Sequence, residues 1–132
     1  MCDIFHYNII EEIQSMSKFE IIVYAKKDGT EPVTDFIYSL PAKIKAKLIR
    51  EIDLLADIGN ELREPYSKHL ENGIFELRVK QGSDISRVLY FFVVGNKIIL
   101  TNGFVKKTQK TPKKEIETAK NYRADYLNRE QE

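Results

Sequence analysis

The side chains best suited to chemistry in this sequence are basic and lie in its carboxyl half. Arg78 and Arg87 occur in two segments that are otherwise rich in strand-forming apolar residues. Burying an arginine charge without a partner is costly, so each arginine needs a reason for its place. One reason is an ion pair, for which Glu76 is the obvious partner. The other is a cationic cleft in which the guanidinium grips a phosphate, and Glu76 can serve both by holding an arginine in place for a ligand.

Lysines flank the two arginine segments. Lys68 precedes the first segment, and Lys106 and Lys107 follow the last apolar run of the chain. The charge of the whole chain is also asymmetric: residues 1–64 carry 8 Lys and Arg against 12 Asp and Glu, whereas residues 65–132 carry 13 against 8. This asymmetry favours a cationic face that binds phosphates, although a solvated lysine-rich loop gives the same pattern.

Other kinds of catalytic site have little support in the sequence. The two histidines, His6 and His69, lie far apart, and no cluster of carboxylates or cysteines has the spacing of metal ligands. We therefore expect neither a metal nor another cofactor. The single cysteine, Cys2, excludes a disulfide within the chain and favours a reducing compartment. Because no apolar run is long enough to span a membrane and no export signal is recognisable, we expect a cytoplasmic protein that does not bind membranes.

The elements that must position the basic residues follow from the hydrophobic periodicity. Residues 1–17 form an amino-terminal extension whose apolar residues have helical spacing, which predicts a short amphipathic helix. The domain itself covers residues 18–132. Residues 19–24 are typical of a strand, and Pro32 and Pro41 each favour the start of a helix.

In the carboxyl half the period changes from that of a helix to that of a strand. Residues 75–80 alternate between apolar and charged, and residues 85–94 are apolar almost throughout, as in a central strand covered on both faces. Residues 97–105 form the next strand, in which Gly103 predicts a bulge. Thr111 predicts the cap of a last helix. We therefore expect an α+β domain of the order β-α-α-β-β-β-α, with a small twisted antiparallel-rich sheet, two amino-terminal helices and a carboxyl-terminal helix.

Three motifs follow one another in this half of the chain. They are Gly73-Ile74-Phe75-Glu76-Leu77-Arg78, then Ser86-Arg87-Val88-Leu89-Tyr90-Phe91-Phe92, then Gly103-Phe104-Val105-Lys106-Lys107-Thr108-Gln109-Lys110-Thr111-Pro112. In this order they resemble the phage-derived branch of the RelE/HigB family, the toxins of bacterial type II toxin–antitoxin systems. The resemblance spans residues 19–122 and implies a RelE-like fold for nearly the whole chain.

The resemblance also implies an activity and partners. Such a toxin is a metal-independent endoribonuclease, an mRNA interferase that enters the ribosomal A site, cleaves the messenger and inhibits translation. Its partner is a cognate helix-turn-helix antitoxin, HigA-like, which neutralises it, and operator DNA is contacted only through the antitoxin. By analogy the 2′-hydroxyl of the RNA attacks the neighbouring phosphate and leaves a cyclic phosphate and a free 5′-hydroxyl. This reaction needs a base, positive charge near the phosphorane and an acid.

Roles for single residues follow from the matched positions. The resemblance implies that Arg78 and Arg87 stabilise the phosphorane. Lys106 and Lys107 match a basic pair that binds phosphate, and one of them is expected to protonate the leaving group. Lys68 is the candidate general base, because a lysine among other cations gives up its proton more readily.

The remaining expected RNA contacts are Phe104, Thr108, Lys110 and His69. Phe104 either stacks on a base or faces the core, and His69 either acts in the site or is a structural residue of a surface loop. Some members of the wider family use a tyrosine near the end of the chain. Tyr122 and Tyr126 occur there, and helix packing is the alternative role for both.

Two other functions stay open on the same scaffold. The fold also includes ParE-like inhibitors of DNA gyrase, and a basic domain of this kind can bind RNA without cleaving it. The four basic residues Arg78, Arg87, Lys106 and Lys107 favour the nuclease.

Overall fold

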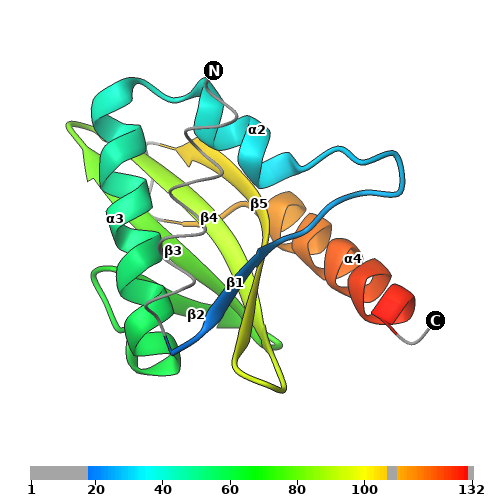
Figure 1. Cartoon of the computed structure of the whole chain (residues 1–132). Helices are drawn as coiled ribbons and strands as arrows, with labels where there is room; N and C mark the ends of the chain where they lie inside the picture. The colour runs from blue at the N-terminus through cyan, green and yellow to red at the C-terminus, as the bar shows by residue number, and fades with distance from the viewer. Residues whose placement is uncertain (1–17, 107–109, 131–132) are drawn as a thin grey trace.

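A five-stranded sheet forms the centre of the computed structural model, which describes residues 18–106 and 110–130 (Figure 1). The elements are β1 (Glu20–Val23), α2 (Pro32–Ser39), α3 (Ala42–Ile58), the 3₁₀ turn η1 (Gly59–Glu61), β2 (Ser67–Glu71), β3 (Ile74–Gln81), β4 (Asp84–Val93), β5 (Lys97–Lys106) and α4 (Lys113–Glu130). The strands lie in the order β1-β5-β4-β3-β2. β1 pairs parallel to β5, and all the other neighbours pair antiparallel. The expected α+β class with an antiparallel-rich sheet is therefore confirmed.

The strand β2 is absent from the predicted order. That order placed Lys68 and His69 in a loop before the sheet, whereas both residues belong to β2. Ser67–Glu71 pairs antiparallel with β3 through a tight turn. The turn contains Asn72 and Gly73, whose φ angles are 49° and 79°. Asn-Gly is a strong hairpin signal, because both central positions of such a turn need positive φ. The sequence signal that indicates β2 is therefore the turn that follows it, not the polar sequence of the strand itself. The observed order of elements is β-α-α-β-β-β-β-α.

The two amino-terminal helices follow the predicted periodicity. Pro32 stands at the start of α2, where its missing N–H group removes no helical hydrogen bond. On α3, the apolar residues Leu48, Ile52 and Leu55 are fully buried. Gly59 ends this helix, because its positive φ of 64° turns the chain out of the helical path.

Helices cover both faces of the sheet (Figure 1), and an apolar core lies on each face. On one face Leu77 and Val88 pack with the buried residues of α2 and α3. On the other face Leu89 and Phe91 pack with Ala119 of α4. Alternate residues of a strand point to opposite faces, so the central strand β4 is buried on both, as its continuous apolar run predicts.

The prediction of a bulge at Gly103 is wrong. The register between β4 and β5 shifts two residues earlier, at Thr101. Gly103 meets a different requirement, because a Cβ atom at this position would lie 2.3 Å from the ring of Phe36 on α2. The glycine thus allows α2 to approach the sheet closely.

The helix α4 begins at Lys113, two residues after the predicted cap. The hydroxyl of Thr111 instead donates a hydrogen bond to the carboxylate of Glu76 on β3. Towards the other end of α4, the Tyr24 hydroxyl donates to the carboxylate of Asp125 at 2.6 Å. Burial, followed by this hydrogen bond, raises the pKa of Tyr24 to about 12. Polar contacts thus hold α4 to the sheet near both of its ends.

The amphipathic helix predicted for residues 1–17 lies outside the described residues. Within 18–106 and 110–130, no helix has both the length and the apolar character needed to cross a bilayer.

We expect Gly103→Ala to lower the free energy of unfolding by about 1–3 kcal/mol, because the new methyl group collides with the Phe36 ring. Urea unfolding followed by circular dichroism measures this change. The double variant with Phe36→Ala is the control, in which most of the cost of the methyl group should disappear. An equal cost with and without the ring would show that the close approach is not the reason for the glycine.

Candidate active site

Basic residues from four strands lie on one face of the sheet. On β3, Glu76 and Arg78 are two residues apart and therefore share this face. Lys68 of β2 lies directly opposite Glu76, and Arg87 of β4 lies directly opposite Arg78. On β5, Phe104 lies opposite Arg87, and Lys106 follows Phe104 by two residues. Lys106 therefore belongs to the same face. The register of the sheet thus brings together basic residues that are far apart in the sequence.

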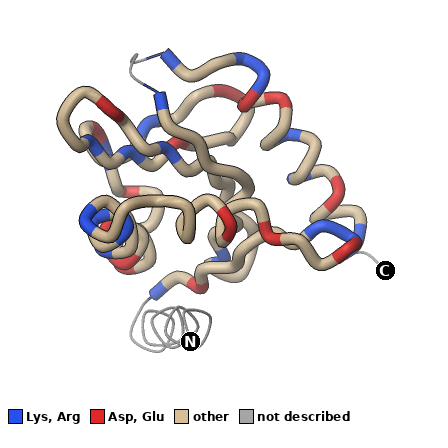
Figure 2. Tube along the Cα trace, turned by 90° about the horizontal axis from the view of Figure 1, so that it is seen from above, with Lys and Arg blue, Asp and Glu red and all other residues tan. Residues whose placement is uncertain are grey.

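Figure 2 marks the basic residues of the strands along the chain trace. In that view α3 is seen end-on, and Lys and Arg residues lie on the strands between α3 and the start of α4. Lys80 extends the set, since it follows Arg78 by two residues on β3 and lies in the same row as Lys106. The strands therefore provide a cationic surface of the kind that binds a polyanion.

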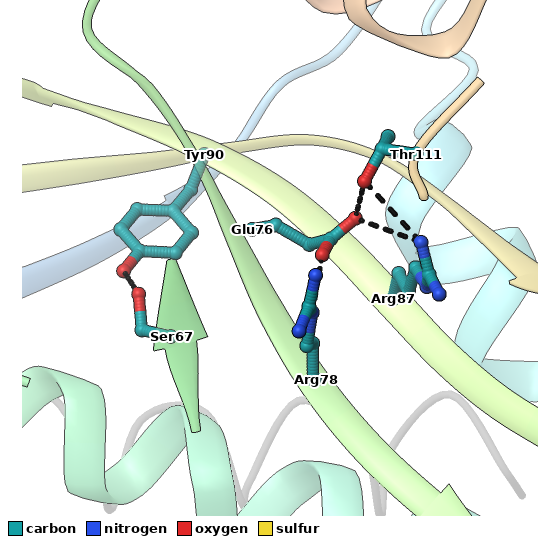
Figure 3. A network of polar contacts seen from close by, with 6 residues as sticks. All are labelled: Ser67, Glu76, Arg78, Arg87, Tyr90 and Thr111. Atoms are coloured by element: carbon teal, nitrogen blue, oxygen red, sulfur yellow. Dashed lines mark hydrogen bonds and ion pairs between the residues drawn. The ribbon is translucent and has the colours of Figure 1, made fainter. Parts of the chain in front are cut away.

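The carboxylate of Glu76 joins the two arginines and Thr111 into one group, here called the arginine cluster (Figure 3). Glu76 Oε1 accepts a hydrogen bond from Arg78 Nε at 2.5 Å. Glu76 Oε2 lies 3.5 Å from Arg87 Nη1 and also accepts from the Thr111 hydroxyl. Arg87 Nη1 donates in addition to the Thr111 oxygen at 3.3 Å. The expected ion pair with Glu76 is confirmed, and it involves both arginines.

The two arginines of the cluster differ in burial. The side chains of Arg87 and Glu76 are both 0% exposed, whereas 14% of the Arg78 side chain is exposed. Burial lowers the pKa of Arg87, and the charge of Glu76 opposes this effect. An arginine nevertheless keeps its charge at neutral pH. Arg87 therefore pairs with Glu76 beneath the surface, and Arg78 is the arginine of the cluster that reaches the surface. The expected role of both arginines at the phosphorane stays a prediction.

The two predicted site residues of β2 point to opposite faces. Lys68 is exposed on the face of the arginine cluster, next to Glu76. His69 is also exposed, and its Nε2 accepts a hydrogen bond from the backbone N–H of Gly73 at 3.1 Å. Its ring also meets the edge of the Phe75 ring, with the centroids 4.9 Å apart. These contacts give His69 a structural role in the β2–β3 hairpin.

The predicted site residues around the end of β5 have different environments. Lys106 and Lys110 are exposed on either side of residues 107–109, so the predictions for Lys107 and Thr108 lie outside the described residues. Phe104 is only 9% exposed and belongs to the apolar core beneath α4. Of its two expected roles, the structure supports core packing.

The tyrosines near the end of the chain also have packing roles. Tyr122 stacks on Tyr24 with the ring centroids 4.6 Å apart. Tyr126 meets the ring of Phe91 edge-on at 6.0 Å. Both contacts hold α4 against the sheet.

Arg78 also lines an open hollow that the sequence analysis did not predict. This hollow, here called the edge pocket, has a volume of about 340 Å³ and lies between α3 and the part of β3 that extends past β2. Its lining residues are Lys47, Arg50, Glu51, Pro65, Tyr66, Arg78, Val79 and Lys80. Four of these side chains are cationic and one is acidic, so the pocket has an excess of positive charge. A small polar anion is the ligand that such a lining favours.

Two hydrogen bonds fix the walls of the edge pocket. Lys47 Nζ donates to the side-chain oxygen of Gln81 at 3.0 Å and so joins α3 to the end of β3. The backbone N–H of Arg78 donates to the carbonyl oxygen of Tyr66 at 2.9 Å, which places the segment before β2 beside β3. The pocket is therefore assembled from three separate segments of the chain.

The sequence contains one weak signal for this pocket. Lys47, Arg50 and Glu51 have the spacing i, i+3 and i+4, so they share one face of α3. A solvated helix face has the same pattern, and the spacing alone does not reveal that β3 lies opposite. As for metal sites, the described part of the chain contains no group of three or more His, Cys, Asp or Glu side chains placed to hold an ion.

A comparison with models of protein families identifies the family of the chain. The model of the family described as phage-derived protein Gp49-like matches residues 35–124, which include the arginine cluster and the edge pocket. The chain belongs to the Gp49-like family. This family is associated with RelE-like toxins of toxin–antitoxin systems, which agrees with the resemblance to a phage-derived branch. No curated protein sequence matches the chain.

We expect Glu76→Gln to destabilise this Gp49-like protein by about 3–5 kcal/mol, because Arg87 would stay buried without an opposite charge. Glu71→Gln is the matched control, because it removes the carboxylate of an ion pair, Glu71 with Lys120, in which both side chains are partly exposed. The control should leave the stability nearly unchanged, because water and salt screen an exposed ion pair. Both values come from urea unfolding at neutral pH. If the two variants lose the same stability, the buried pair does not organise the cluster.

Proposed function

We propose that this Gp49-like protein is the toxin of a toxin–antitoxin pair and that it cleaves messenger RNA on the ribosome, as a metal-independent endoribonuclease of the RelE/HigB type. The observation that carries this proposal is the fixed orientation of Arg78. A buried carboxylate holds its Nε, while the side chain reaches a surface that also presents Lys68 and Lys106. An oriented guanidinium among lysines suits the phosphodiester of an RNA chain. The association of the family with toxins supports the same conclusion.

In the proposed reaction the ribose 2′-oxygen attacks the neighbouring phosphorus, and the 5′-oxygen leaves. Arg78 neutralises the negative charge that builds up on the phosphorane oxygens, which is the largest electrostatic requirement of this step. Arg87 acts through Glu76 as a positioning residue. Lys68, Lys106 and Lys107 are proposed to bind the phosphates on either side, since cations in a row match the spacing of a nucleic-acid backbone.

The proposed partners follow from the same surface. The substrate is messenger RNA in the ribosomal A site, and the inhibitor is a cognate helix-turn-helix antitoxin of the HigA type. Both meet the toxin in the cytoplasm, where translation takes place. An antitoxin that covers the basic face would block RNA directly, because a lysine already paired with the antitoxin no longer binds a phosphate.

We expect Arg78→Lys to reduce cleavage of translated messenger by about 100-fold or more, because a point charge does not replace the planar fork that Glu76 orients. Primer extension on a messenger translated in a reconstituted system measures the cleavage. Lys27→Ala is the control, since Lys27 is exposed in the turn between β1 and α2, away from the arginine cluster, and its loss should leave cleavage unchanged.

The same experiment separates the proposed function from its alternatives. Intact messenger with the wild-type protein, together with gyrase-linked DNA breaks, would identify a ParE-like inhibitor instead. RNA binding by the wild type without any cut would identify a binding module. Full cleavage by Arg78→Lys would exclude a guanidinium contact to the phosphorane.

A further inference from the structure

We propose that the edge pocket binds one nucleotide of a single-stranded RNA and that Glu51 accepts the proton of its 2′-hydroxyl. The inference rests on the proposed ribonuclease function and supplies the general base that this reaction needs. The carboxylate of the arginine cluster is not available for that task. Glu76 is fully buried and already accepts hydrogen bonds from Arg78, Arg87 and Thr111.

Glu51 differs from Glu76 in having an oxygen to which none of the described residues donates a hydrogen bond. It lies on α3, is partly buried and lines the edge pocket. Its Oε2 atom is buried, and among residues 18–106 and 110–130 no group donates a hydrogen bond to it. A buried carboxylate oxygen in this state is costly, and such atoms often mark the place of a ligand. The oxygen is shielded from the open pocket as well as from solvent, so a ribose hydroxyl would reach this carboxylate through a rotation of the Glu51 side chain toward the pocket that it lines.

The rest of the lining suits the other parts of a nucleotide. Arg78 and Lys80 provide positive charge from β3, and Arg50 provides it from α3, so a phosphodiester entering the pocket meets cations on two walls. Tyr66, which is 45% exposed, provides an aromatic ring on which a base can stack. The volume of about 340 Å³ is of the size of a single nucleotide. The ligand class is therefore unpaired RNA.

The electrostatic environment of Glu51 favours proton transfer. Burial raises the pKa of Glu51, and the charge of Arg50 opposes this effect. The other groups that face the pocket are Lys47 on the same helix, Arg78 and Lys80 on β3, and the Tyr66 hydroxyl. A carboxylate with a raised pKa is a stronger base than an ordinary glutamate.

The step balances without any further reactant. The 2′-oxygen forms a bond to phosphorus while its proton passes to the Glu51 carboxylate. The bond between phosphorus and the 5′-oxygen breaks, and this oxygen takes a proton from water, to which the pocket is open. Glu51 then returns its proton to water. The products are a 2′,3′-cyclic phosphate and a 5′-hydroxyl end.

The test compares Glu51→Gln with Asp53→Asn, which neutralises an exposed carboxylate of the same helix, and with Lys68→Ala, which removes the other candidate base. Cleavage of translated messenger is measured in single turnover over a range of pH. We expect Glu51→Gln to cleave about 100- to 10,000-fold more slowly, the range typical of a lost general base. Wild-type cleavage should fall as the pH drops through the pKa of Glu51, because the carboxyl must be ionised to act, and this dependence should vanish in Glu51→Gln. Asp53→Asn should behave as the wild type.

Binding gives a second, independent measurement. An RNA oligonucleotide with 2′-O-methyl riboses cannot be cleaved, and its affinity is measured by fluorescence anisotropy. Arg50→Ala and Tyr66→Ala should weaken binding, whereas Glu51→Gln should keep the wild-type affinity. Glu51→Gln should also keep its stability at neutral pH: a carboxyl whose pKa is raised by folding stabilises the fold at low pH and loses that contribution as the pH rises.

The outcomes distinguish this inference from the proposed function. If the wild type leaves translated messenger intact, the ribonuclease function itself fails. If the wild type cleaves and Glu51→Gln cleaves at the same rate with the same pH profile, only the role of Glu51 fails. A loss of cleavage in Lys68→Ala with no loss in Glu51→Gln would assign the base to Lys68 instead. Partial activity in Glu51→Asp, which keeps a carboxylate, would support the proposal.

Discussion

The arrangement of the basic face depends on one buried carboxylate. Glu76 accepts from Arg78 and Thr111 and forms an ion pair with Arg87, so it connects two neighbouring strands to the segment that leads into α4. An uncompensated charge at this depth would be strongly destabilising, and the two arginines and the carboxylate therefore stabilise one another only as a set. As a consequence, the Arg78 side chain has a fixed orientation although it is partly exposed.

The two carboxylates near Arg78 have opposite environments. Glu76 accepts hydrogen bonds from two arginines and a threonine, which makes it part of the scaffold. Glu51 is partly buried at the wall of the edge pocket, and one of its oxygens has no donor among the described residues. Two groups of the same chemical type thereby acquire a structural role and a proposed catalytic role, and the environment alone makes the difference.

The edge pocket exists because β2 is shorter than β3. The pairing of β2 with β3 ends near Tyr66, and the rest of β3 faces α3 across an open hollow. Side chains that alternate along β3 reach this hollow from the free edge of the strand, which explains how Arg78 belongs both to the arginine cluster and to the pocket. The proposed site thus combines a rigid hydrogen-bonded cluster with a solvent-open cavity, and both lie within the part of the chain that matches the Gp49-like family.

The sequence by itself determined the class of the fold, the places of both amino-terminal helices and the buried central strand, because hydrophobic periodicity is a local property that burial must satisfy. It also offered Glu76 as the ion-pair partner of an arginine, beside the alternative of a cationic cleft for phosphate, since the apolar surroundings of Arg78 and Arg87 called for one of the two. It did not reveal β2, whose polar residues join the sheet only through their hairpin turn, nor the true reason for Gly103, which is the approach of a ring from a distant helix. The tertiary structure alone decided the burial of Arg87 and the placement of Glu51 and Arg78 around one pocket. Both depend on which residues strand register and helix packing place opposite each other, and no local pattern encodes that choice.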